Sequence, residues 1–553
     1  MKETIVGDVR QSLILLLCAV GLVLLIGCVN IANLLLARAS SRSREIALRQ
    51  TLGAARHRLI RQLLTESLLL SLIGGLVGLA VLFATKEFLL RLVPDSLPRL
   101  NEVSINWAVL LFALLTSLVA GTIFGLAPAL QSGKLDLLSM LKRESRGSSS
   151  GEQARTRRLL VVAEFALSLV LMIAAGLLLR SFWDLLNVRP GFNTQNAMAV
   201  RIWLPIPNDE KTDIYDTIPQ ESALLREILR RAKTIPGVNE AAIGNVASVP
   251  LGHAWRDQRP LGLILEGHER DTASPPLVNR AIVSPEYFHL LGMTLLRGRF
   301  FTDFDDANAP AVSVVNDSFA RSYWPGEDAL GKRFKRPADK DWTTVVGVVA
   351  DARTESLTQE GIPETYFSAY QSSPKALSVF LRGQLDPAAA PVELRRQVQS
   401  IDPQLPVFGA HTLDEIFSQS LAERRFSLQI IGLFSLTALL LAGLGIYGVI
   451  SYIVSERTRE IGIRLALGAP RENILRMVLR QGLTLALYGA AVGLICALIV
   501  THLMSGLLYG VYPADPLTFV AVSLLLLASA SLACYIPARR AIRIDPLLAL
   551  RHD

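Results

Sequence analysis

RSREIALRQTLGAARHRLIR at Arg42–Arg61 returns near the other end of the chain as RTREIGIRLALGAPRENILR at Arg457–Arg476. The two stretches are offset by 415 residues, and ten of eleven aligned charged, apolar and glycine positions are identical. Each copy lies between two long apolar segments. The sequence therefore predicts a membrane unit that occurs twice, with a basic helical segment at one face of the bilayer.

The repeat continues beyond this segment at an offset of 409 residues, where Pro128-Ala129 matches Pro537-Ala538 and Asp136 matches Asp545. The first membrane unit is assigned to residues 11–144 and the second to 426–553, each with three spans. Residues 1–10 align with 416–425. They are therefore expected to be the remnant end of a first outer domain, whose leading span and main part the sequence does not contain.

Seven apolar stretches have the roughly 20 residues that a membrane helix needs. The loops between them alternate between many and few Lys and Arg residues, and positive loops stay in the cytoplasm. This pattern places the N-terminus and the long loop of residues 184–425 outside the cytoplasm. The seven stretches are Leu13–Ala37, Leu63–Val93, Trp107–Leu130, Leu159–Phe182, Leu428–Val454, Val478–Leu508 and Leu517–Pro537.

The long outer loop reads as a mixed α/β domain. A strand at Val200–Leu204, an amphipathic helix at Glu221–Lys233 and a strand at Ala241–Ala247 follow one another, and the order returns after Leu377. Two subdomains are expected, the second inserted into the first. The predicted fold class is a polytopic α-helical membrane protein of about seven transmembrane helices with a large extracytoplasmic α/β domain. A Ser/Gly-rich linker at 145–157 precedes the helix at 158–183.

Composition and motifs argue against several classes of function. The net charge of +8 lies beside the apolar segments, because residues 187–425 carry 26 Lys and Arg against 30 Asp and Glu, and nucleic acid is not expected as a partner. The seven histidines show no metal-binding spacing, and all four cysteines lie in apolar segments, so no metal or cofactor is expected. Gly326–Arg333 resembles a phosphate-binding loop but has Arg333 where Ser or Thr would hold Mg²⁺, so a surface turn is favoured.

Glu164 is the one acidic residue early in the fourth span. A carboxylate at the centre of a bilayer would suggest ion coupling. Because Arg158 lies only six positions before it, pairing or hydration near the basic interface is the favoured interpretation.

The two basic segments are the candidate site. Ile46/Ile461, Leu48/Ile463 and Leu52/Leu467 are expected to give an apolar side, and the glycines are expected to break each run into two short helices. A collar for anionic lipid headgroups would need only Lys and Arg. Since the acidic residue and the glycine also repeat, a docking surface for a protein partner is favoured. Its residues are Arg44, Glu45, Arg49, Gly53, Arg56, Arg459, Glu460, Arg464, Gly468 and Arg471.

At these residues the sequence resembles the FtsX/MacB-type (type VII) ABC transporter permeases and is similar to the duplicated permeases of acidobacteria. Phrases of the outer domain fit as well, including Ile235-Pro-Gly-Val238 and Trp324-Pro-Gly326. The resemblance implies a MacB-like periplasmic domain, a place in the bacterial inner membrane and a partner subunit that supplies the ATPase in the cytoplasm. A periplasmic adaptor and a second permease chain are further candidate partners.

Two functions from different classes remain open. The first is the permease subunit of an export or mechanotransmission system that couples ATP hydrolysis to motion of the periplasmic domain. The second is a non-transporting scaffold or regulator of a periplasmic or cell-wall enzyme. The chain is not expected to be an enzyme, because no ATPase motif set is recognised in it.

Overall fold

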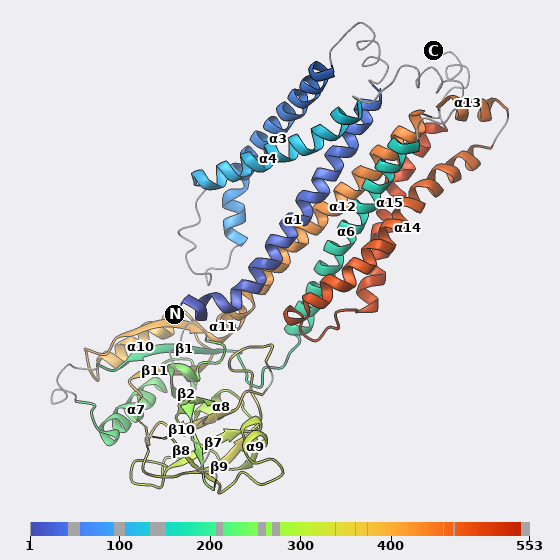
Figure 1. Ribbon diagram of the computed structural model, residues 1–553. Coiled ribbons are helices and arrows are strands. Elements are labelled where there is room, and N and C mark those ends of the chain that lie inside the picture. The colour runs from blue at the N-terminus through green and yellow to red at the C-terminus, as the bar shows by residue number, and fades with distance from the viewer. Residues whose placement is uncertain are drawn as a thin grey trace. The chain divides into compact units, whose positions relative to one another are not determined.

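The chain forms two compact units in the computed structural model (Figure 1). Unit 1 comprises Met1–Asp184 with Arg424–Asp553, and unit 2 comprises Leu185–Glu423, close to the predicted outer domain of 184–425. The structure describes residues 2–41, 56–92, 106–132, 151–205, 214–252, 261–267, 277–337, 339–359, 361–372, 374–456, 458–467 and 470–542.

Unit 1 consists of helices. Six are long and apolar enough to cross a bilayer among the described residues, and the shorter apolar segment Trp107–Thr122 lies within the helix expected as the third span. Helices suit a bilayer because all their backbone polar groups bond within the segment. The helices are α1 (Lys2–Ser41), α3 (Arg56–Leu92), α4 (Trp107–Ser132), α6 (Gly151–Leu186), α12 (Ala422–Glu456), α13 (Thr458–Ala466), α14 (Arg471–Leu503) and α15 (Pro516–Ala541).

The membrane helices occupy equivalent positions in the two copies of the sequence repeat. At an offset of 415 residues, the described part of α1 corresponds to α12 and that of α3 corresponds to α14. At an offset of 409 residues, α4 and α15 begin at corresponding positions. The duplication inferred from the sequence is therefore also a duplication of helices.

One prediction about the connection between the repeats needs correction. Helix α6 begins at Gly151, so the second half of the predicted linker 145–157 is helical. Arg157, which was assigned to that linker, is buried. Residues 145–150 lie outside the described residues. The helix predicted at 158–183 is thus extended at its N-terminal end by about two turns.

The core of unit 1 is built mainly on α6. Phe165, Leu169 and Ile173 of this helix are fully buried and cluster with side chains of α12, α14 and α15. Another buried cluster joins α6 to α1 and α12 through Ile26, Leu171, Ile431 and Ala438. Helix α3 packs against α4. Helix α6 is therefore surrounded by helices from both repeats.

Unit 2 contains a mixed sheet of twelve strands among the described residues, as the sequence predicts for an α/β domain. The order is β12-β1-β11-β2-β5-β10-β7-β9-β8-β4, with β3 paired to β5 and β6 paired to β9. The strands are β1 (Ala197–Trp203), β2 (Val238–Asn245), β3 (Leu261–Gly262), β4 (Ile264–Leu265), β5 (Leu277–Val283), β6 (Leu295–Gly298), β7 (Val312–Asn316), β8 (Arg333–Lys335), β9 (Thr343–Val349), β10 (Glu364–Ser368), β11 (Ala376–Gly383) and β12 (Val407–Thr412).

Two apolar cores lie along this one sheet. The first includes side chains of α7 (Ile218–Ala232) and α10 (Ala389–Gln399) packed against β1, β2 and β11. The second surrounds Phe319 and Phe334 and is drawn from residues between β2 and β11. The expected insertion is present, but the sheet continues through it. Strands β2 and β5 join the two parts with one registered pair, Gly244 with Val283.

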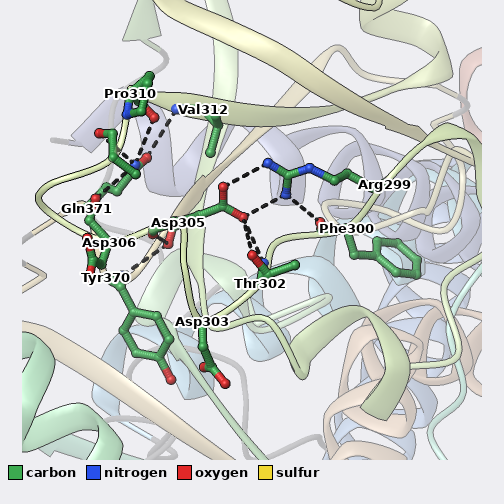
Figure 2. A network of polar contacts seen from close by, with 12 residues as sticks. Arg299, Phe300, Thr302, Asp303, Asp305, Asp306, Pro310, Val312, Tyr370 and Gln371 are labelled. Atoms are coloured by element: carbon green, nitrogen blue, oxygen red, sulfur yellow. Dashed lines mark hydrogen bonds and ion pairs between the residues drawn. The ribbon is translucent and has the colours of Figure 1, made fainter.

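The loop after β6 is held by a polar network (Figure 2). Arg299 donates from both terminal nitrogens to Asp305, over 2.7 and 2.8 Å, and the backbone N–H of Thr302 donates to the same carboxylate over 2.8 Å. Gln371 donates to the carbonyl of Pro310 and accepts from the N–H of Val312. These bonds fix the loop to the start of β7.

Candidate docking surface

Helix α13 carries the second basic segment. It is a short helix between the end of α12 and the start of α14 (Figure 1). Pro470 precedes α14 as its N-cap residue. The predicted break near Gly468 lies between α13 and α14, although Gly468 itself is outside the described residues. After the break the chain enters the first turn of the 33-residue α14, and not the second short helix that was expected.

The apolar residues of α13 point in different directions, which corrects the expectation of a single apolar side. Ile461 is 1% exposed and belongs to the core of unit 1, beside Val454, Ile474 and Val478. Ile463 and Leu467 are 41% and 81% exposed. Two residues of a helix that are two positions apart lie about 200° apart around its axis, so Ile461 and Ile463 cannot share a face.

The charged residues lie on the exposed part of α13. Glu460 and Arg464 form an ion pair of 2.6 Å across one helical turn, and both side chains are about half exposed. Arg464 also lies 3.1 Å from the sulfur of Met477 on α14. Arg471, the first residue of α14, is exposed. The described part of the surface therefore presents Ile463, Leu467 and paired charges on a helix fixed by Ile461.

The first copy of the segment is mostly outside the described residues, which applies to Arg44, Glu45, Arg49 and Gly53. Arg56 opens α3 and Arg459 lies in α13, but only their backbones are described. Of the ten predicted residues, the structure thus brings together Glu460, Arg464 and Arg471 with described side chains.

The stretch that resembles a phosphate-binding loop is a surface turn, as the sequence analysis favoured. Gly326 and Gly331 both adopt positive φ, at 78° and 77°. Lys332 pairs with Glu327 over 2.5 Å, and Arg333 pairs with Glu266. Each of the two basic side chains therefore pairs with a carboxylate of the same domain.

The expectation for Glu164 was wrong. Its side chain is fully buried, about 10 Å along the helix beyond Arg157, and it accepts a 2.6 Å hydrogen bond from the Asn30 amide of α1. Arg158 is exposed and makes no ion pair with Glu164 in the described structure. The sequence does contain a signal for this contact, because two polar residues, Asn30 and Asn33, interrupt the apolar first span. They could have indicated that α1 packs against a polar group of another helix.

Comparison with protein families assigns both units. The FtsX-like permease C-terminal model matches residues 17–137 and again 432–546, and the MacB-like periplasmic core domain model matches residues 167–401. The chain is thus a multi-pass protein of the bacterial inner membrane with a large periplasmic domain. It belongs to the FtsX/MacB-type (type VII) ABC transporter permeases, as the sequence analysis predicted.

Two curated relatives illustrate the extent of the similarity. The macrolide export ATP-binding/permease protein MacB of Mannheimia succiniciproducens is 25% identical over 53% of this chain and 45% of its own length. The pyoverdine export ATP-binding/permease protein PvdT of Pseudomonas entomophila is 32% identical over 47% of this chain and 40% of its own. The chain therefore spans less than half of these relatives.

A solved structure also aligns with the chain. The periplasmic region of MacB from Actinobacillus actinomycetemcomitans covers 42% of this chain and 96% of its own, with 16% identity and a TM-score of 0.28.

Proposed function

We propose that the chain is the permease subunit of an ABC-type export or mechanotransmission system. In this proposal a separate cytoplasmic subunit hydrolyses ATP and binds the two repeated basic segments. The motion then passes through the membrane helices to the periplasmic domain. The two FtsX-like matches and the export names of the relatives support a permease role for these helices.

The proposal depends mainly on one observation about α13: one face of this helix is buried in the core of unit 1, and the opposite face is exposed. Helix α12 leads from the periplasmic domain across the bilayer, so α13 at its far end lies on the cytoplasmic side. A partner that binds Leu467 and Ile463 would push on a helix whose Ile461 is embedded among α12 and α14. Because protein interiors are closely packed, such a displacement moves the helices and not α13 alone.

The path to the periplasm is continuous in the chain. Helix α12 starts at Ala422, directly after α11 (Leu413–Ser420), and α11 directly follows β12. Helix α6 ends at Leu186, shortly before β1. Strands β1 and β12 are hydrogen-bonded neighbours in the sheet. Both helices are thus connected through the chain to neighbouring strands at one edge of the periplasmic sheet, where the proposal has their motion act.

The test is co-purification of the full chain with a candidate ATP-binding subunit from the same organism. Reversal of both repeated acids, Glu45→Lys with Glu460→Lys, is expected to abolish the association because it places like charges within each basic segment. Asp328→Lys, an exposed reversal in the periplasmic domain, is the matched control and should leave association intact. Undiminished association of the double variant would contradict the docking role.

A further inference from the structure

Buried polar groups line the contact between α1, α6 and α12, where apolar side chains would be expected in a membrane bundle. Ser435 of α12 donates to the Leu171 carbonyl over 3.2 Å, and Ser168 of α6 donates to the Ala438 carbonyl over 3.3 Å. Asn30 of α1 donates to the Leu441 carbonyl over 2.9 Å. We name this contact the polar seam, defined by Asn30, Asn33, Arg157, Glu164, Ser168, Ser435, Gly445 and Tyr452.

Glu164 lies in the middle of the polar seam and is fully buried. Its Oε1 accepts the 2.6 Å bond from Asn30, and its Oε2 has no hydrogen-bond partner in the part of the chain that the structure describes. The carboxyl group lies directly against Gly445 of α12, where a Cβ would be only 2.1 Å from Oε2. The three helices therefore enclose the carboxyl group between the Asn30 amide of α1 and the backbone of α12 at Gly445.

Among the described residues, no basic side chain forms an ion pair with Glu164. Helix α1 contributes the neutral amides of Asn30 and Asn33, and α12 contributes Gly445 and the Tyr452 ring. Arg157, two turns before Glu164 on α6, donates to the Leu36 carbonyl and places its guanidinium 4.0 Å from the Tyr452 ring. On α15, Arg540 is bound to the Tyr447 hydroxyl over 3.0 Å.

A charged carboxylate is expensive inside a membrane bundle unless a cation or several donors compensate it. Glu164 has one described donor and one unpartnered oxygen. Protonation of Glu164 at Oε2 makes the carboxyl group neutral and removes the buried charge. Asn33, one turn along α1 from Asn30, is also buried, and its amide forms no hydrogen bond with another described residue.

We propose that Glu164 is a proton-binding site of the membrane bundle, occupied while the polar seam is closed. When α1 or α12 moves away and water enters, the O–H bond breaks, its electron pair stays on the carboxylate and the proton passes to water. Closing the seam reverses the step. Motion of the bundle and proton binding are then linked, and each biases the other.

Infrared spectroscopy of the full chain in lipid nanodiscs tests the site. At pH 7, where an ordinary glutamate is ionised, the wild type is expected to show the C=O stretch of a neutral carboxylic acid. Glu164→Gln should lose this band, and Asn30→Ala should shift it by removing the hydrogen bond to Oε1. Glu87→Gln, an exposed carboxyl on α3, should leave the band unchanged.

A wild-type spectrum at pH 7 without the neutral-acid band would overturn the proposal and requires no variant. The same conclusion follows if Glu164→Gln folds and keeps the band. A separate measurement, the pH dependence of the thermal midpoint, tests the linkage between proton binding and the closed bundle. Raising the pH from about 7 to about 9 should lower the thermal midpoint of the wild type more than that of Glu164→Gln, which is permanently neutral. Equal shifts in both proteins would overturn the linkage.

Discussion

The Glu460 carboxylate lies 2.6 Å from Nη2 of Arg464, and the same spacing of acid and arginine recurs at Glu45 and Arg49. Exposed pairs one helical turn apart contribute only about 0.3–0.5 kcal/mol to stability. The double variant Glu460→Ala with Arg464→Ala should therefore leave the thermal midpoint within experimental error while weakening association with the ATP-binding subunit. Thermal unfolding and co-purification of the same preparation measure both. A large loss of stability would assign the pair a structural role.

Ile461 in α13 and Leu467, the residue that directly follows this helix, should have separable roles in anchoring and in docking. Ile461→Ala removes a buried side chain and is expected to cost about 2–5 kcal/mol of unfolding free energy. Leu467→Ala acts on an exposed side chain and should change stability by less than about 0.5 kcal/mol. In a titration with the proposed ATP-binding subunit, Leu467→Ala should reduce affinity at least severalfold. The interpretation of α13 fails if Leu467→Ala binds like the wild type.

Gly445 should tolerate no side chain. Gly445→Ala places a methyl group on the Glu164 carboxyl, and such overpacking costs about 1–3 kcal/mol. Gly432, on the same helix, has open space where its Cβ would be. Gly432→Ala should therefore be neutral or slightly stabilising, because alanine favours helix. Thermal unfolding of the two variants in detergent compares them directly, and equal midpoints would contradict the close approach of α6 and α12.

The Arg299–Asp305 pair should make the periplasmic domain sensitive to acid. Burial alone would raise the pKa of Asp305, but hydrogen bonds from Arg299 and Thr302 outweigh it and lower the pKa below its ordinary value. A lowered pKa means that the folded state binds the proton less tightly than the unfolded state. The stabilisation is therefore present above the unfolded pKa of about 3.9 and is lost as the pH falls through the folded value.

Asp305→Asn should accordingly cost about 1 kcal/mol at pH 7, a value reduced for the partial exposure of Arg299. Its deficit relative to the wild type should shrink below about pH 4. Denaturant unfolding of the full chain, followed by tryptophan fluorescence at several pH values, checks this. Asp328→Asn, whose partner Arg297 lies at the surface, is the control. A deficit that is constant with pH would exclude an ionic origin.

The sequence predicted the elements of the fold well. Apolar length located the membrane helices, and the repeat gave the correspondence of α4 with α15. In unit 2, the predicted strands Val200–Leu204 and Ala241–Ala247 overlap β1 and β2, although the observed strands begin about three residues earlier. These features depend on local pattern, which the sequence contains directly. The continuity of the sheet through both cores did not follow, because it depends on one pairing, Gly244 with Val283, that leaves no local signal.

The candidate site was predicted less completely. The repeated motif identified the segment, but its apolar residues were assigned to one face because the rotation of α13 against α12 and α14 was unknown. Glu164 was judged from its neighbour Arg158 on the same helix. The residues that decide its environment, Asn30 and Gly445, are far away in the chain. A single sequence does not state which membrane helices touch.

The pairing of β1 with β12 has a mechanical consequence. Met198, near the start of β1, lies opposite Thr412, the last residue of β12, so the two ends that lead to the membrane leave the sheet side by side. If both attached helices are displaced together, the load passes into the sheet as a whole. If they are drawn apart, the β1–β12 ladder opens one rung at a time from that end. The domain would therefore resist a joint displacement of the two helices more strongly than a force that separates them.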